Sequence, residues 1–243
     1  MLVLVRMVSF LAASPLFSLR NIPQRVKIGI CLGLTALVTP QVNLTDFSLP
    51  QGYVELISMV LTETITGLTA GIGASMVFSV FRMAGQYLDL HIGFAAAQLF
   101  DPMSVEHNTL LAQFLYMLGI VLLFSLDAHH FLLMALAKSF QVIPLGRLIS
   151  PEVTVLRLMQ IFGLSVTYAL RIAFPVIVVL FLFDLGLGFI SRAVPQFNVL
   201  MAGFPLKIFV GVLGVSLALP VLGSVVGAVF EIMEKEVSIL FGF

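Results

Sequence analysis

Long apolar segments follow one another along the chain, separated by short stretches in which Pro, Gly and charged residues concentrate. They lie near residues 1–19, 28–39, 52–81, 84–100, 109–137, 158–191 and 206–230. Three stretches, 64–81, 108–126 and 208–230, contain no acidic or basic side chain. Because about 20 residues of helix cross the hydrocarbon core of a bilayer, the pattern predicts several membrane spans.

Backbone polar groups inside a membrane must be hydrogen-bonded within the protein, which leaves helices and closed barrels as spanning structures. The chain shows none of the ten-residue alternation that is typical of barrel strands. We therefore expect an all-α integral membrane protein. No boundary has the composition of a linker, so we expect a single domain over residues 1–243. The first segment carries Arg6 and has only weak cleavage candidates at Ala12 and Ala13, so we expect it to be retained.

Composition supports the membrane assignment and excludes some partners. Hydrophobic residues make up 60% of the chain and charged residues 10%, against about half and a quarter in soluble domains. Twelve basic and twelve acidic residues are spread thinly, without a basic cluster that would grip phosphates. A nucleic-acid partner is therefore not expected. Cys31 is the only cysteine, which excludes an intrachain disulfide and indicates a small packing residue.

Several apolar segments are poorly suited to contact lipid. Pro175 and Pro220 lie inside two of them, and proline removes a helical hydrogen bond and kinks a helix unless neighbouring groups compensate. Charges also lie within or between these segments, and a charge in hydrocarbon costs ~2.5–3.5 kcal/mol on insertion scales. We therefore expect these charges to face protein or water. They are Arg171, Asp184, Arg192 and Lys207.

Small residues recur at helical spacing in two places. Gly67 and Gly71 are one turn apart, as are Gly223 and Gly227. This spacing lets two helix backbones approach closely. The neighbouring helix could belong to a companion subunit or to this chain, and the pattern does not distinguish the two.

Candidate catalytic chemistry is sparse. The densest ionisable cluster is Asp127, His129 and His130, and a carboxylate with two imidazoles can hold a metal. Adjacent histidines in a helix, however, point about 100° apart, so both cannot face one ion without a partner strand or loop. The favoured interpretation is the membrane-interface end of the helix that begins near residue 109, with no metal and no cofactor. Nucleophile elbows, phosphate loops and His-Glu-x-x-His motifs are missing from the sequence, so an enzyme is not expected.

Short motifs in a fixed order run over nearly the whole chain. The N-terminal ones are Arg6, Phe10, Pro15, Phe17, Ile22-Pro-Gln-Arg-Val-Lys27 and Thr39-Pro40. The central ones are Glu63, Gly67, Gly71, Ala84-Gly-Gln-Tyr-Leu-Asp89, Gly93-Phe94, Phe100-Asp101-Pro102, Gln113-Phe-Leu-Tyr116, Asp127-Ala-His-His130, Ser139-Phe140 and Ile143-Pro-Leu-Gly146. The last are Arg171-Ile-Ala-Phe-Pro175, Gly186-Leu-Gly188, Arg192, Pro195-Gln-Phe-Asn-Val199 and Gly203-Phe-Pro-Leu-Lys207.

This series resembles the FliR family of flagellar export proteins and its relatives in injection-type secretion systems. The segments 113–116 and 127–130 look more like the flagellar branch. The resemblance implies a non-enzymatic core subunit of the flagellar type III protein export gate, through which unfolded flagellar proteins pass. It also implies a location in the bacterial inner membrane, at the flagellar basal body.

The resemblance further implies partners and an architecture. The family assembles with FliP and FliQ, alongside FlhA and FlhB, and its tilted, kinked helical hairpins pack in a multi-subunit gate. A loop of this subunit helps to obstruct the closed pore. By order along the chain, that loop corresponds to Phe100, Asp101, Pro102, Met103, Ser104, Val105, Glu106, His107 and Asn108. From the residues alone, this Pro-interrupted polar stretch could also be a plain external loop.

Three alternatives remain at this stage. The first is an export component of an injection-type system. The second is a secondary transporter, favoured by the prolines and charges inside apolar segments. The third is a membrane metalloenzyme built on the Asp–His–His cluster, which would require a tightly bound metal.

Overall fold

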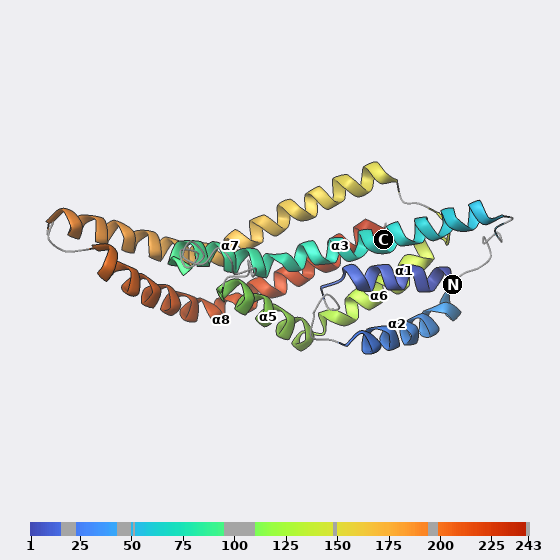
Figure 1. Ribbon diagram of the computed structural model, residues 1–243, viewed down its shortest axis with the longest axis horizontal. Coiled ribbons are helices and arrows are strands. Elements are labelled where there is room, and N and C mark those ends of the chain that lie inside the picture. The colour runs from blue at the N-terminus through green and yellow to red at the C-terminus, as the bar shows by residue number, and fades with distance from the viewer. Residues whose placement is uncertain are drawn as a thin grey trace. The chain divides into compact units, whose positions relative to one another are not determined.

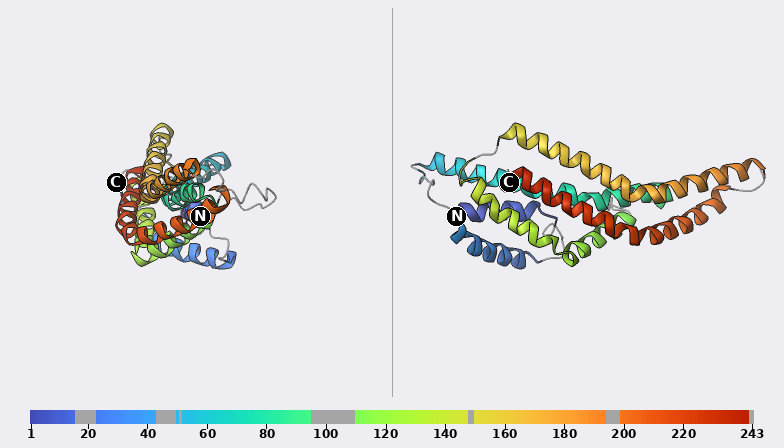
Figure 2. Two further views of the ribbon diagram at one scale, coloured as in Figure 1. Left: turned by 90° about the vertical axis from the view of Figure 1, so that its left-hand side faces the viewer. Right: turned by 180° about the vertical axis from the view of Figure 1, so that it is seen from behind.

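The described part of the chain is built of helices (Figures 1 and 2). The computed structural model describes residues 1–15, 23–42, 50, 52–94, 110–147, 150–193 and 199–241, and these residues contain no strand. The elements are α1 (Leu2–Ala13), α2 (Gln24–Val38), the 3-10 helix η1 (Thr39–Gln41), α3 (Tyr53–Ile92), α5 (Leu110–Ser125), α6 (Ala128–Val142), α7 (Pro151–Ala193) and α8 (Val199–Phe241). The all-α expectation is confirmed.

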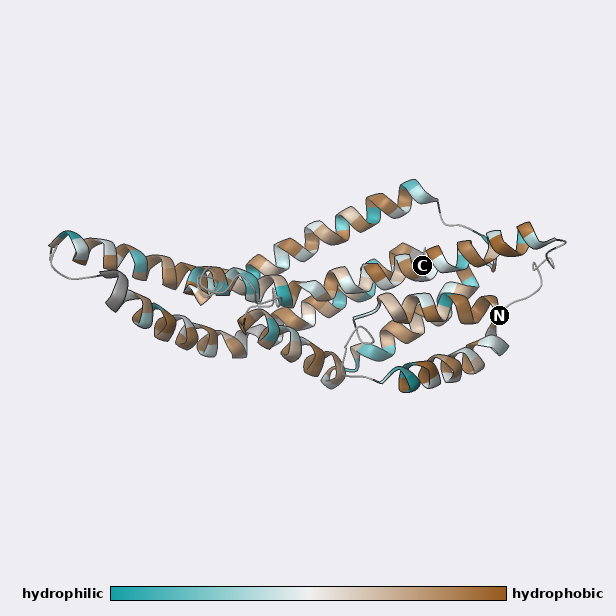
Figure 3. Cartoon of the chain, viewed as in Figure 1, coloured by the Kyte–Doolittle hydropathy of each residue, from teal (hydrophilic) through white to brown (hydrophobic). Residues whose placement is uncertain are grey.

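Among the residues that the structure describes, three helical segments are long and apolar enough to cross a membrane: α3, α7 and Gly203–Pro220 of α8. The number rises to four if α5 and α6, which are separated by a break, are counted as one span. Figure 3 shows apolar residues along nearly the full length of α7 and α8. Length and composition therefore confirm the expected class of integral membrane protein.

One expected boundary is wrong. The sequence suggested separate segments over 52–81 and 84–100, but α3 continues from Tyr53 to Ile92. The polar residues that looked like interruptions have partners: the Arg82 guanidinium lies 4.3 Å from the centre of the Tyr116 ring. Asp89 is fully buried and accepts hydrogen bonds from the backbone of α5. Polar side chains therefore do not interrupt this helix.

A second boundary is also wrong. The apolar run over 109–137 is divided, because α5 ends at Ser125 and α6 begins at Ala128. Asp127, between them, has the left-handed conformation, with φ at 55°. The sequence suggested that Asp127, His129 and His130 mark the end of the helix that begins near residue 109. In the structure they lie at the start of the next helix, α6.

The internal prolines do not end their helices. Helix α7 continues through Pro175, and α8 continues through Pro205 and Pro220. Each of these helices is 43 residues long. The chain thus accommodates the missing proline hydrogen bonds within long continuous helices.

Contacts within the chain divide it into two compact units. Unit 1 comprises 1–78, 123–164 and 230–243, and unit 2 comprises 79–122 and 165–229. In unit 1, α1 lies alongside α3 (Figure 1). A Cβ atom added to Gly67 would lie 2.5 Å from the carbonyl oxygen of Arg6, and one on Gly71 would lie 2.7 Å from that of Phe10. Both glycines therefore allow the two backbones to approach closely.

In unit 2, the C-terminal part of α3 packs on α5 in the same manner. A Cβ on Gly85 would lie 2.6 Å from the carbonyl oxygen of Leu111 and would also meet the backbone of Ala112. The unit 2 parts of α7 and α8 run side by side (Figures 1 and 2). Both helices leave large apolar side chains exposed, with Phe174 at 62% and Leu217 at 78%.

Candidate functional site

A buried ion pair connects three helices in unit 1. Arg6 of α1 and Glu63 of α3 are both completely buried. Arg6 Nε donates to Glu63 Oε2 at 2.6 Å, and Nη2 donates to Oε1 at 3.1 Å. This two-point geometry is the strongest form of arginine–carboxylate contact.

The remaining hydrogen-bonding capacity of the pair is used by α6 and the turn after it. Arg6 Nη1 donates to the carbonyl oxygens of Ser139 and Ile143, each at 3.2 Å. Glu63 Oε1 accepts from the backbone N–H of Gly146 at 2.8 Å. The guanidinium also stacks over Phe140, 4.3 Å from the ring centre. The pair therefore fixes the positions of α1, α3 and the end of α6 within unit 1.

A second buried carboxylate, on α3, lies at the start of α5. Asp89 accepts from the backbone N–H groups of Leu111 at 3.1 Å and Ala112 at 2.9 Å. The first N–H groups of a helix have no partner within it, and a carboxylate there also complements the helix dipole. Helix α3 ends at Ile92, and Gly93 follows with φ at 103°. Asp89 therefore holds the start of α5 against the end of α3.

Two of the four charges expected to avoid lipid form an ion pair. Lys207 Nζ of α8 lies 2.6 Å from Asp184 Oδ2 of α7, with both side chains partly exposed. Arg171 is exposed and lies 4.9 Å from the centre of the Tyr168 ring. Arg192 is exposed in the last turn of α7. Arg171 also lines an open apolar hollow between α7 and α8, together with Pro175 and Leu217.

The other expected site residues are placed differently. A Cβ on Gly223 or Gly227 would meet no atom of the described chain within 4 Å, in contrast to Gly67 and Gly71. The expected pore loop lies outside the described residues. It comprises Phe100, Asp101, Pro102, Met103, Ser104, Val105, Glu106, His107 and Asn108.

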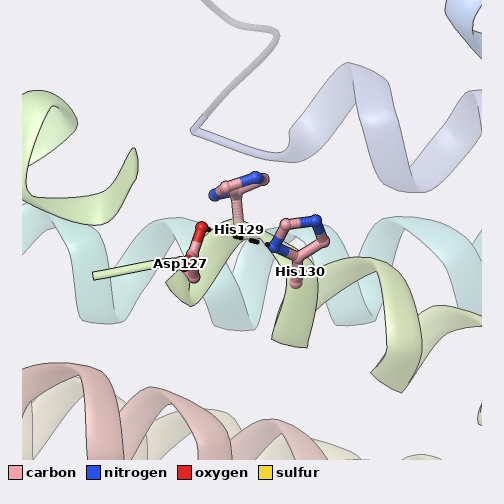
Figure 4. Close-up of side chains that lie close together, drawn as sticks. All are labelled: Asp127, His129 and His130. Carbon is pink, nitrogen blue, oxygen red and sulfur yellow. Dashed lines mark ion pairs between the residues drawn. The ribbon is translucent and has the colours of Figure 1, made fainter. Parts of the chain in front are cut away.

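The Asp–His–His cluster lies at the start of α6 (Figure 4). Asp127 Oδ1 is 3.5 Å from His130 Nδ1, and one potential ligand atom from each of the three residues lies within 4.8 Å of the others. The imidazole of His129 lies between two rings, with its centre 4.9 Å from that of Phe124 and 4.2 Å from that of His130. The cluster is thus more compact than the divergence of adjacent helical side chains suggested.

The roles of Arg6, Glu63 and Asp89 were not predicted, although all three stand in the motifs above. A usable signal was present, because a lone charge in an apolar segment requires a partner. The identity of each partner depends on tertiary packing: Arg6 and Glu63 are 57 positions apart.

Comparison with known proteins identifies the family. The family model described as "Bacterial export proteins, family 1" matches residues 1–233. The flagellar biosynthetic protein FliR of Pectobacterium carotovorum subsp. carotovorum is 31% identical over 90% of this chain and 83% of its own length. FliR of Bacillus subtilis strain 168 is 30% identical over 96% and 90%. FliR of Escherichia coli K12 is 27% identical over 86% and 79%. With a match over nearly its whole length, this chain belongs to family 1 of the bacterial export proteins.

Proposed function

We propose that this chain is a core subunit of the flagellar type III protein export gate and forms part of the conduit for unfolded flagellar proteins. The family match over residues 1–233 is the observation that carries this proposal. The relatives with the FliR name support the flagellar branch over the injection-type branch. The gate stands in the bacterial inner membrane, at the flagellar basal body.

FliP and FliQ are the companions with which this chain forms the core of the gate, and FlhB and FlhA stand beside them. The exposed apolar faces of α7 and α8 support such an assembly. Both helices carry charges among large exposed apolar side chains such as Phe174 and Leu217. Charged positions are costly against lipid, whereas the apolar ones are not. Companion polypeptides would shield the charged positions from lipid and would pack on the apolar ones.

The subunit acts as a conduit rather than an enzyme. Energy for transport comes from other components, and this chain supplies a deformable apolar wall. Methionine side chains adapt to irregular surfaces, and small residues leave room for helices to move. In the closed state, residues 100–108 obstruct the pore, with apolar side chains such as Phe100 and Met103 forming the seal.

The seal can be tested by ion leak. Replacing Phe100 and Met103 together by Ala should raise ion conductance through the assembled gate, because smaller side chains leave a wettable path. The matched control replaces the exposed Phe114 of α5 and Met134 of α6 by Ala and should leave the conductance unchanged. Unchanged conductance in a correctly assembled double variant would show that this loop does not form the seal.

The assembly can be tested by purification. A tagged copy of this chain, expressed with FliP and FliQ, should purify as a stable complex with both. A secondary transporter would instead be monodisperse alone or as a homo-oligomer under the same conditions. When the three proteins are expressed together, purification of this chain without FliP and FliQ would contradict the proposal.

A further inference from the structure

We propose that Asp127, His129 and His130 form a binding site for a divalent transition metal, with Zn²⁺ the ion that best suits the donor set. The site is separate from the conduit function. It would serve to fix the start of α6, next to the break that follows α5.

The break brings the three side chains together. Asp127 adopts φ 55° and ψ 16° and precedes the first residue of α6. The two histidines lie in the first turn, and their ring centres are 4.2 Å apart despite the divergence of adjacent helical positions. Figure 4 shows the Asp127 carboxylate near both imidazoles, with its ion pair to His130 marked. The break at residues 126–127 thus supplies the carboxylate, and the two imidazoles lie closer together than the divergence of adjacent helical positions suggests.

Asp127 and His130 are exposed and contact each other, and His129 has a nitrogen that is unpaired within the described residues. Asp127 occupies the N-cap position of α6, where a carboxylate usually accepts from the first N–H groups, yet its side chain makes no such hydrogen bond. His129 Nδ1 is buried and has no hydrogen-bond partner in the described part of the chain. An unpaired buried polar atom is unfavourable, and a metal bond would satisfy it.

The donor types select the class of metal. Imidazole nitrogen favours zinc, nickel and copper, whereas magnesium and calcium prefer oxygen ligands. Zinc bonds to nitrogen at about 2.0–2.1 Å and to carboxylate oxygen at about 2.0–2.2 Å, so its ligands lie roughly 3.4 Å apart. The donor atoms lie within 4.8 Å of one another, so binding zinc would require side-chain rotations that bring them closer together. Three protein ligands leave a fourth position for water or for a group from a companion subunit.

The test uses the full-length chain, purified in detergent through a tag that contains no histidine. Co²⁺ serves as an optical probe of tetrahedral coordination, and Zn²⁺ affinity is measured by competition with a chromophoric chelator. The wild-type chain should bind one ion. Asp127→Asn, His129→Gln and His130→Gln should each weaken binding by at least about tenfold, since loss of outer-shell partners alone costs about 10–100-fold. His91→Gln is the matched control, because His91 is exposed on α3 outside the cluster, and it should bind as the wild type does.

Two results would overturn the site. One is a wild-type chain that shows neither the tetrahedral Co²⁺ spectrum nor stoichiometric Zn²⁺ binding. The other is stoichiometric binding that survives in the triple variant. The wild-type measurement decides the matter even if a variant fails to fold, and it requires no companion subunit. It therefore stands or falls independently of gate assembly.

Discussion

Every nitrogen of the Arg6 side chain has an acceptor, and both oxygens of Glu63 have donors. Because every polar group of the pair has a hydrogen-bond partner, the pair favours a single arrangement of the helices around it. Replacing the pair by two apolar residues of similar size would change the free energy of unfolding little, because burial removes the hydration of both charges. Removing only one partner is different, since it leaves an uncompensated charge in the protein interior.

We expect Arg6→Met and Glu63→Leu to lower the free energy of unfolding by about 3–5 kcal/mol each. The double variant should be clearly less destabilised than the sum of the two, because it leaves neither charge unpaired. Thermal unfolding of the purified chain in detergent measures the effect, and Glu234→Gln, on an exposed position of α8, is the control. Additive effects in the double variant would show that the two side chains do not depend on each other.

The same residues show what can be predicted at this scale. A lone arginine and a lone glutamate in apolar segments predict buried pairing in general. Their mutual pairing could not be predicted, because Ser139, Ile143 and Gly146 complete the site from a distant part of the chain. The Asp184–Lys207 pair is similar, since each charge was expected to avoid lipid but its partner came from the packing of α7 on α8.

At the scale of elements, close helix packing depends on a few glycines. Gly85 is the clearest case, since a Cβ there would meet the backbone of Leu111 and Ala112. Backbone atoms cannot avoid an added Cβ by rotating about a side-chain bond, as the end of a flexible side chain can. Gly73, on the same helix, differs: a Cβ would meet only the side chains of Ile161, Leu158 and Leu240, at 3.7–3.8 Å, which is ordinary contact.

We therefore expect Gly85→Ala to destabilise the packing of α3 on α5, by about 1–3 kcal/mol as is usual for overpacking. Gly73→Ala should be neutral or stabilising, because alanine favours a helix by about 1 kcal/mol over glycine. Hydrogen exchange at the amides of Leu111 and Ala112 reports the difference directly, since both are held by Asp89. Equal protection in the two variants would show that the close approach at Gly85 is not needed.

Helix existence followed from the apolar pattern, but two boundaries did not. Helix α3 continues past Arg82 because Tyr116 of α5 covers the guanidinium, which is a tertiary effect. The break after α5 carries neither glycine nor proline, so the strongest local turn signals are missing from it. Asp127 adopts the left-handed conformation instead, which aspartate tolerates better than most residues.

At the scale of the whole molecule, the sequence supported the class, the family and the membrane setting. Those conclusions rest on patterns that extend over hundreds of residues, such as hydropathy and the order of motifs. The role of residues 100–108 and the surroundings of α7 and α8 depend on contacts with companion chains, which the sequence of one subunit does not encode.

The most direct test of the central claim asks what covers the exposed apolar side chains of α7 and α8. A photo-crosslinking amino acid is placed at Phe174 or at Leu217 in cells that assemble the export apparatus. The account predicts that illumination joins this chain to FliP, FliQ or another export protein at both positions. Adducts with lipid alone, in cells whose gate is assembled and active, would contradict it.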